Sequence, residues 1–157
     1  MKTFTCCFTG HRKLPVNRIQ NIKKSLEEEL EKLISQGAIT FLAGGAIGFD
    51  TLASQTILEL KQKYPNIRLI LILPCKNQSQ SWNELDKQTY TYIKEHADGI
   101  FYVSDQYFRG CMHLRNRALV DSSDYCVCWL TQGTGGSAYT VDYAKKKGIP
   151  VLNLASL

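Results

Sequence analysis

The chain has 157 residues, 44% hydrophobic and 21% charged, so we expect one globular domain over residues 1–157 and exclude a disordered or fibrous protein. The formal net charge of +5 favours anionic ligands but is small for a dedicated duplex-binding domain. The longest apolar run, Leu69 to Pro74, is too short to cross a bilayer, and the N-terminus lacks a signal-peptide pattern. We therefore expect a cytoplasmic protein with no membrane partner.

Six cysteines are present, but their spacing does not favour a metal site. No C-x-x-C pair occurs, and four of the six lie inside apolar, strand-like stretches where a free cysteine acts as a small hydrophobic residue. The sequence therefore predicts no metal cofactor.

Strand-like and helical patterns alternate along the chain. The expected strands are Phe4–Thr9, Ile39–Ala43, Ile67–Leu73, Ile100–Val103, Tyr125–Trp129 and Val151–Leu154. The expected helices are Val16–Gln36, a segment with an apolar stripe from Leu52 to Leu60, Ser79–His96, Gly110–Val120 and Ser137–Lys147. The aliphatic run at 67–73 is typical of a strand covered on both faces.

This alternation predicts an α/β fold: a doubly wound, Rossmann-like, three-layer domain with a mostly parallel sheet of about five to six strands. Ligands of such sheets lie outside the carboxyl ends of the strands, where the strand order reverses. The turns that follow strands are therefore the first places to search for function.

The first informative turn contains Gly10, His11 and Arg12, directly after the first strand. Arg12 offers a planar set of donors suited to phosphate, and His11 could bond a ligand hydroxyl or transfer a proton. The alternative interpretation is an exposed loop with two polar side chains.

The second turn reads G-G-A-I-G-F-D and contains Gly44, Gly45, Gly48 and Asp50. Its spacing is neither the dinucleotide fingerprint nor a phosphate loop with G-K-[ST]. Its amides and the following helix N-terminus could hold an anion. Asp50 either caps that helix or accepts hydrogen bonds from a ribose.

A third turn and the helix before it supply further candidates. Gly133, Thr134, Gly135 and Gly136 precede a helix, where amides and helix dipole would act together on a phosphate; the alternative is a flexible turn. Arg115 and Asn116 are expected to point sideways from the core face of their helix, toward a ligand or toward solvent. Trp82 either stacks on a base or packs in a core or interface.

These motifs together resemble the SLOG superfamily of Rossmann-like nucleotide-binding domains, and within it the YpsA-type proteins, over almost the whole chain. The segments that carry the resemblance are F-T-G-H-R-K-L-P at 8–15, G-G-A-I-G-F-D at 44–50, L-P-C at 73–75 with Gln80 and Trp82, G-C-M-x-x-R-N-R at 110–117 and T-V-D-Y-A at 140–144. Relatives of this type include the DprA DNA-processing proteins and the LOG, or lysine-decarboxylase-like, phosphoribohydrolases.

The resemblance implies a pocket for a nucleotide or nucleotide-derived small molecule, and a homodimer. The LOG motif P-G-G-x-G-T is replaced by Gly133 to Ser137, and the helix-borne Arg and Glu pair of those enzymes is not recognisable. We therefore expect a binding or sensing protein more than an enzyme.

Two alternatives stay open at this stage. One is a nucleotide hydrolase or N-glycosidase that uses His11 or Asp50 for proton transfer. The other, less favoured, is a DprA-like single-stranded nucleic-acid binder with a basic track of Arg109, Arg115, Arg117 and Lys145 to Lys147.

Overall fold

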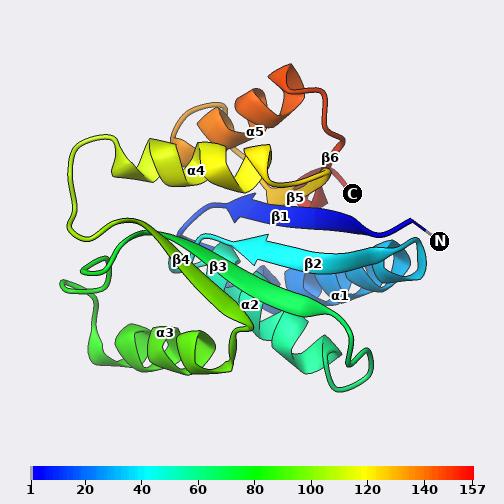
Figure 1. The fold of residues 1–157 in the computed structure, drawn as a ribbon. Coiled ribbons are helices and arrows are strands. Elements are labelled where there is room, and N and C mark those ends of the chain that lie inside the picture. The colour runs from blue at the N-terminus through cyan, green and yellow to red at the C-terminus, as the bar shows by residue number, and fades with distance from the viewer. Residues whose placement is uncertain (1) are drawn as a thin grey trace.

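The computed structural model describes residues 2–157, in which a six-stranded parallel sheet lies between two layers of helices (Figure 1). The strands are β1 Phe4–Gly10, β2 Ala38–Ala43, β3 Arg68–Cys75, β4 Gly99–Ser104, β5 Tyr125–Trp129 and β6 Val151–Asn153. Their order in the sheet is β4-β3-β2-β1-β5-β6. The expected doubly wound, Rossmann-like fold is confirmed, and its strand order reverses between β1 and β5.

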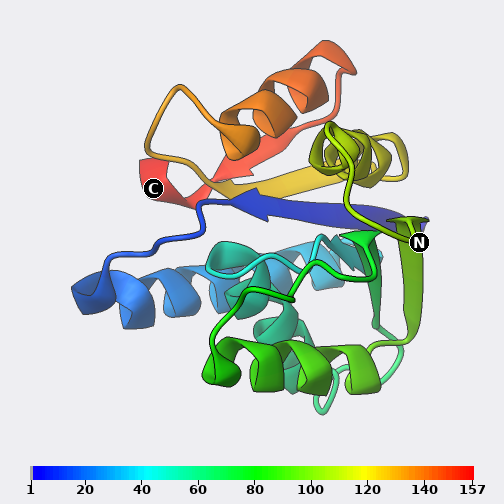
Figure 2. The same ribbon diagram turned by 90° about the vertical axis from the view of Figure 1, so that its left-hand side faces the viewer.

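The helices divide between the two faces of the sheet (Figure 2). One layer holds α1 Ile19–Ser35, α2 Phe49–Leu60 and α3 Glu84–His96, and the other holds α4 Cys111–Asp121 and α5 Gly136–Lys146. Short 3-10 turns precede α1 and end the chain, at η1 Val16–Arg18 and η2 Leu154–Ser156. Because β-α-β crossovers are right-handed, the change in the direction of strand addition moves the helices to the opposite face.

Two hydrophobic clusters form the core, one on each side of the sheet. Successive residues of β1 alternate between them: Cys6 and Phe8 pack toward α1 to α3, and Cys7 packs toward α4 and α5. The Phe8 ring stacks on Phe41 with 6.1 Å between centroids. All six cysteines are buried free thiols.

Element boundaries differ from the sequence expectation chiefly at α3. The predicted helix from 79 begins instead at Glu84, because residues 76–82 form turns and Asn83 caps the helix by accepting a 2.8 Å hydrogen bond from the Asp86 amide. The last strand ends at Asn153 rather than 154, since Leu154 begins η2.

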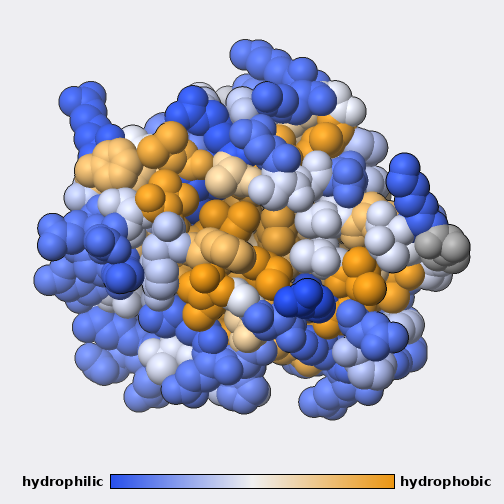
Figure 3. All heavy atoms as spheres, in the orientation of Figure 1, coloured by the Kyte–Doolittle hydropathy of each residue, from blue (hydrophilic) through white to orange (hydrophobic). Residues whose placement is uncertain are grey.

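One face of β2, β3 and β4 is only partly covered by α4, and Figure 3 shows hydrophobic side chains gathered over it. An apolar cavity of about 420 Å³ lies here, with Ile70, Ile72 and Phe101 in its wall. Because Ile70 is only half-buried, the expectation that β3 is covered on both faces was partly wrong. Within residues 2–157, no helix is long and apolar enough to span a membrane.

Candidate functional site

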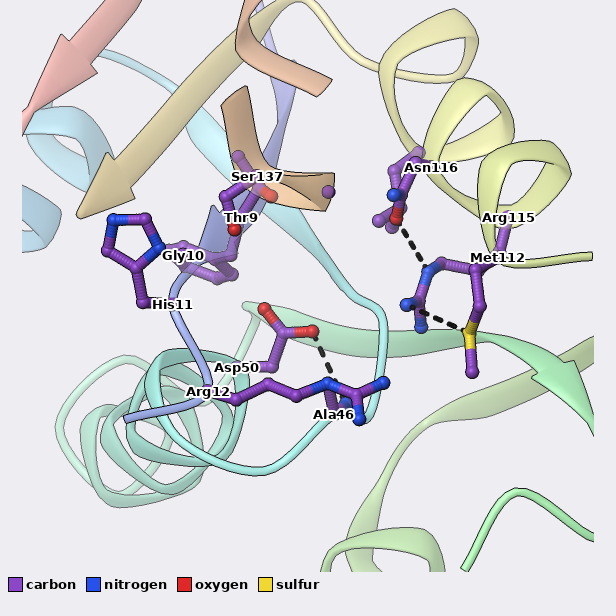
Figure 4. A pocket seen from close by; sticks show the side chains of 13 residues that line it. Thr9, Gly10, His11, Arg12, Ala46, Asp50, Met112, Arg115, Asn116 and Ser137 are labelled. Atoms are coloured by element: carbon purple, nitrogen blue, oxygen red, sulfur yellow. Dashed lines mark hydrogen bonds between the residues drawn. The ribbon is translucent and has the colours of Figure 1, made fainter. Parts of the chain in front are cut away.

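A cavity of about 360 Å³ lies where the strand order reverses, outside the carboxyl end of β1 (Figure 4). Topology alone placed a ligand site at this position. We call it the switch-point cavity. Its wall is built from β1 and the turn after it, from the β2–α2 turn and the first turn of α2, and from one face each of α4 and α5. The lining residues are Phe8, Thr9, Gly10, His11, Arg12, Ala46, Asp50, Met112, Arg115, Asn116, Leu119, Gly136 and Ser137.

The turn after β1 supplies a fixed ring and a free cation. The Nε2 atom of His11 accepts a 2.9 Å hydrogen bond from the Thr131 amide, so this nitrogen carries no proton, and the ring holds the loop after β5. The His11 carbonyl accepts from the Phe49 amide at 3.1 Å. Arg12 is exposed and forms no ion pair with residues 2–157, so its guanidinium is available to an anion.

Asp50 lies at the first turn of α2 and directs its carboxyl into the cavity (Figure 4). It is 6% exposed and accepts a 3.3 Å hydrogen bond from the Ala46 amide. Burial raises the pKa of this carboxyl to about 6, although the positive charges of Arg115 and Arg12 act in the opposite direction. A carboxyl with this pKa is partly protonated near neutral pH, and it can therefore accept or donate a hydrogen bond.

Arg115 and Asn116 form the α4 wall and are both buried, with exposed fractions of 5% and 9%. The Arg115 guanidinium donates from Nη1 to the Gly44 carbonyl and from Nε to Asn116 Oδ1, the latter at 2.8 Å. Burial lowers the Arg115 pKa, and the nearby Asp50 carboxylate opposes that change. Since Arg115 is buried, it cannot belong to a surface basic track of the kind that the nucleic-acid alternative required.

The glycines of the β2–α2 turn lie behind the cavity, and none of them lines it. A side chain at Gly44 would meet the Arg115 guanidinium, and one at Gly45 would meet Leu73. Gly48 has φ +84°, and a Cβ there would collide with the Arg12 carbonyl. The amides of Ala46 and Phe49 are already bonded within the protein. The packing of this turn against α4, β3 and the turn after β1 therefore accounts for these three glycines.

The turn before α5 is placed differently. Gly136 and Ser137, in the first turn of α5, line the cavity, whereas Gly133, Thr134 and Gly135 are exposed beyond it. No side chain of residues 2–157 caps this helix, so its first amides lie beside the cavity with their donor capacity free. Of the two glycine-rich turns, this one offers backbone donors to an anion.

Sequence reasoning did not include Thr9, Ala46, Met112 and Ser137 among the site residues, yet they line the cavity. Ser137 directly follows the glycine run and could have been found from the helix start. Met112 is an apolar residue whose spacing favours the core face of its helix, so the sequence carries no signal for its place in the wall. No group of three potential metal ligands occurs in residues 2–157.

Comparisons with known proteins agree on the fold of the chain. The YpsA family model, the YspA SLOG family, matches residues 6–149. A UPF0398 protein of Halalkalibacterium halodurans is 32% identical over 132 residues, which cover 82% of this chain and 70% of that protein.

Two solved structures share the arrangement at low identity. One is DNA processing protein A from Helicobacter pylori, whose structure concerns a single-stranded DNA binding mode, with 22% identity and a TM-score of 0.65. The other is DNA processing protein A (DprA) from Streptococcus pneumoniae, with 17% identity and a TM-score of 0.68. The similarity covers 94% and 95% of this chain but only 63% and 49% of theirs, so both proteins are considerably longer.

Proposed function

Since the chain belongs to the YspA SLOG family, and its switch-point cavity joins a free arginine to an uncapped helix N-terminus, we propose that it binds a nucleotide or nucleotide-derived small molecule there. The observation that carries the proposal is this convergence of donors from the turn after β1, from α4 and from the start of α5 on one cavity. Binding or sensing, rather than turnover, is the activity we assign.

Each polar group has a role that its chemistry favours. The α5 amides and the Arg12 guanidinium would hold the phosphate, because both are free of partners within residues 2–157. Asp50 would accept a hydrogen bond from a ribose hydroxyl. Arg115 and Asn116 would close the far wall and offset the negative charge of the ligand.

A thermal-shift screen of mononucleotides, cyclic nucleotides, NAD, ADP-ribose and nucleotide sugars tests the proposal, because a ligand that binds only the folded state raises the melting temperature. We expect a selective shift that is lost in Arg12→Ala and kept in Arg18→Ala, an exposed arginine of η1 outside the cavity. The absence of a shift with every compound would overturn the proposal.

One observation favours a second candidate, hydrolysis of the N-glycosidic bond of a nucleotide. The Asp50 pKa of about 6 suits a group that exchanges protons near neutral pH, while His11 Nε2 is occupied by the Thr131 amide. Incubation with nucleoside monophosphates, followed by chromatography for free base, tests this candidate. Release of base that Asp50→Asn abolishes would favour it, and no release from any nucleotide would exclude it.

We also propose that the chain forms a homodimer through β4. Among residues 2–157, this strand pairs only with β3; it contains no charged residue and exposes 64% of Phe101. Edge strands are usually protected by charges, prolines or bulges, because their free backbone groups can pair with another chain. Two copies of β4 paired antiparallel about a twofold axis would satisfy both edges, and the apolar face in Figure 3 would extend the contact.

A further inference from the structure

A second cavity, of about 450 Å³, lies beside the switch-point cavity. It opens between the loop after β3 and the loop after β4, which leave the same edge of the sheet. Arg12 and Met112 line both cavities. The two spaces are therefore neighbouring parts of one crevice, and each has the size of an ordinary small-molecule site.

Aromatic and amide side chains dominate this second wall. Trp82 is half-buried and packs edge to face on the Tyr90 ring, with 5.1 Å between centroids. Tyr107, from the loop after β4, is 61% exposed although it lines the cavity. Planar rings combined with side-chain amides suit a flat heterocycle, because rings contact its faces and amides bond its edge.

The walls are held in place without a ligand. The Lys76 amide donates to the Asp105 carbonyl at 3.1 Å, and the Tyr107 amide donates to Asn77 Oδ1 at 3.1 Å. These two bonds join the β3 loop to the β4 loop. A ligand would therefore meet a nearly formed site and lose little free energy in ordering it.

Gln78 supplies an acceptor that lacks a partner. Its Nε2 donates to Tyr90 Oη at 3.1 Å and to the Gly45 carbonyl at 3.5 Å. Since a carbonyl can only accept, the amide nitrogen must face Gly45, and Oε1 is left buried with no hydrogen-bond partner in residues 2–157. A ligand donor would reach Oε1 when the side chain turns toward the cavity, and that bond would offset the Nε2 bonds that the turn breaks.

We propose that this second cavity holds the base of the bound nucleotide, with Trp82 and Tyr107 against its faces and Gln78 at its edge, while the phosphate lies in the switch-point cavity. The assignment rests on the proposed function and extends it, since it makes the ligand a nucleotide with its base and phosphate on opposite sides of Arg12. A sugar phosphate would fill only one of the two spaces.

Titration calorimetry with ribose 5-phosphate, AMP, GMP, CMP and UMP tests the assignment. We expect at least one mononucleotide to bind tenfold or more tightly than ribose 5-phosphate. Trp82→Ala and Tyr107→Ala should each weaken that nucleotide about tenfold, a typical effect of losing one base-stacking ring, and leave ribose 5-phosphate within twofold. Tyr92→Ala removes an exposed ring of α3 outside both cavities and is the matched control.

The outcomes distinguish a failure of the base site from a failure of the proposed function. If the nucleotides bind, but no more tightly than ribose 5-phosphate, or if both aromatic variants keep the nucleotide affinity, the base site is wrong and the proposed function stands. If no mononucleotide binds, the base site fails, and the thermal-shift screen of cyclic nucleotides, NAD, ADP-ribose and nucleotide sugars decides the proposed function. Because Trp82 also packs on Tyr90, Trp82→Ala could fail to fold. In that case Tyr107→Ala, which changes an exposed ring, decides whether the base site exists.

Discussion

Arg115 of α4 donates a hydrogen bond from Nη1 to the backbone carbonyl of Gly44, which lies 71 positions earlier in the chain at the end of β2. This bond joins the α4 side of the sheet to the turn that leads into α2 on the other side. It also sets a positive charge near the buried carboxyl of Asp50. The shape of the switch-point cavity therefore depends on a buried cation that is part of the fold.

Arg115→Ala should destabilise the protein by about 3 kcal/mol, because it leaves a buried carbonyl without its donor and removes the charge that stabilises the Asp50 carboxylate. Urea unfolding followed by circular dichroism measures the change. Arg117→Ala, on the same helix and only partly buried, should cost under about 1 kcal/mol. Equal losses for the two variants would contradict the role assigned to the Gly44 bond.

Glycines in the two glycine-rich turns should respond differently to alanine. Gly48→Ala imposes a positive φ on a residue with a side chain and drives its Cβ into the Arg12 carbonyl, so we expect a loss of about 2 to 4 kcal/mol. Gly133→Ala meets open space and has no positive φ, so its stability should stay within about 0.5 kcal/mol of the parent. Thermal melts of both variants test the contrast, and a stable Gly48→Ala protein would disprove the packing explanation.

The two glycine-rich turns show which features of the site the sequence predicts and which it does not. Strand-helix alternation predicted the sheet and placed His11, Arg12 and Asp50 at one edge of it, because the carboxyl ends of parallel strands share an edge. It did not predict the strand order, and that order decides which turns become neighbours. Gly44 and Gly136 therefore could not be distinguished from the sequence. In the structure Gly44 packs against Arg115, whereas Gly136 lies in the cavity wall.

Trp82 is a second example of the same limit. The sequence alone does not decide whether Trp82 stacks on a base or packs in a core or interface. In the structure it does part of each, because its ring packs edge to face on Tyr90 and also lines a cavity. Its position depends on the turns at 76–82, and the sequence predicts a helix from residue 79 onward. Local patterns do not predict such a segment well, because its shape is set by hydrogen bonds to the loop after β4.

Asp50 should make stability depend on pH in the direction opposite to a salt-bridged carboxylate. The folded state keeps the Asp50 proton up to a pKa of about 6, whereas the unfolded chain releases it near the ordinary value of 3.8. The unfolded state thus binds fewer protons between these values, and this carboxyl makes folding less favourable as the pH rises through that window. By pH 7 the loss should reach about 3 kcal/mol, since a tenfold change in acidity corresponds to about 1.4 kcal/mol.

Asp50→Asn keeps an acceptor for the Ala46 amide but cannot ionise, so its stability relative to the parent should rise between pH 4 and pH 7. Urea unfolding at half-unit steps of pH measures this difference. Asp142→Asn, an exposed carboxylate on α5, should track the parent across the same range. A constant gap between Asp50→Asn and the parent would show that the buried carboxyl does not titrate in this window.

Phe101→Lys should convert the proposed dimer into a monomer. The substitution places a charge on the edge strand β4, where pairing with a second copy would bury it, and the exposed position of Phe101 leaves the core intact.

Light scattering after gel filtration at about 100 μM should give twice the chain mass for the parent and for Leu85→Lys, which changes an exposed apolar side chain of α3. The variant Phe101→Lys should elute at the mass of one chain and keep the far-UV circular dichroism spectrum of the parent. A monomeric parent would refute the dimer itself, and a dimeric Phe101→Lys would refute pairing through β4, because the charge would then not lie in the interface.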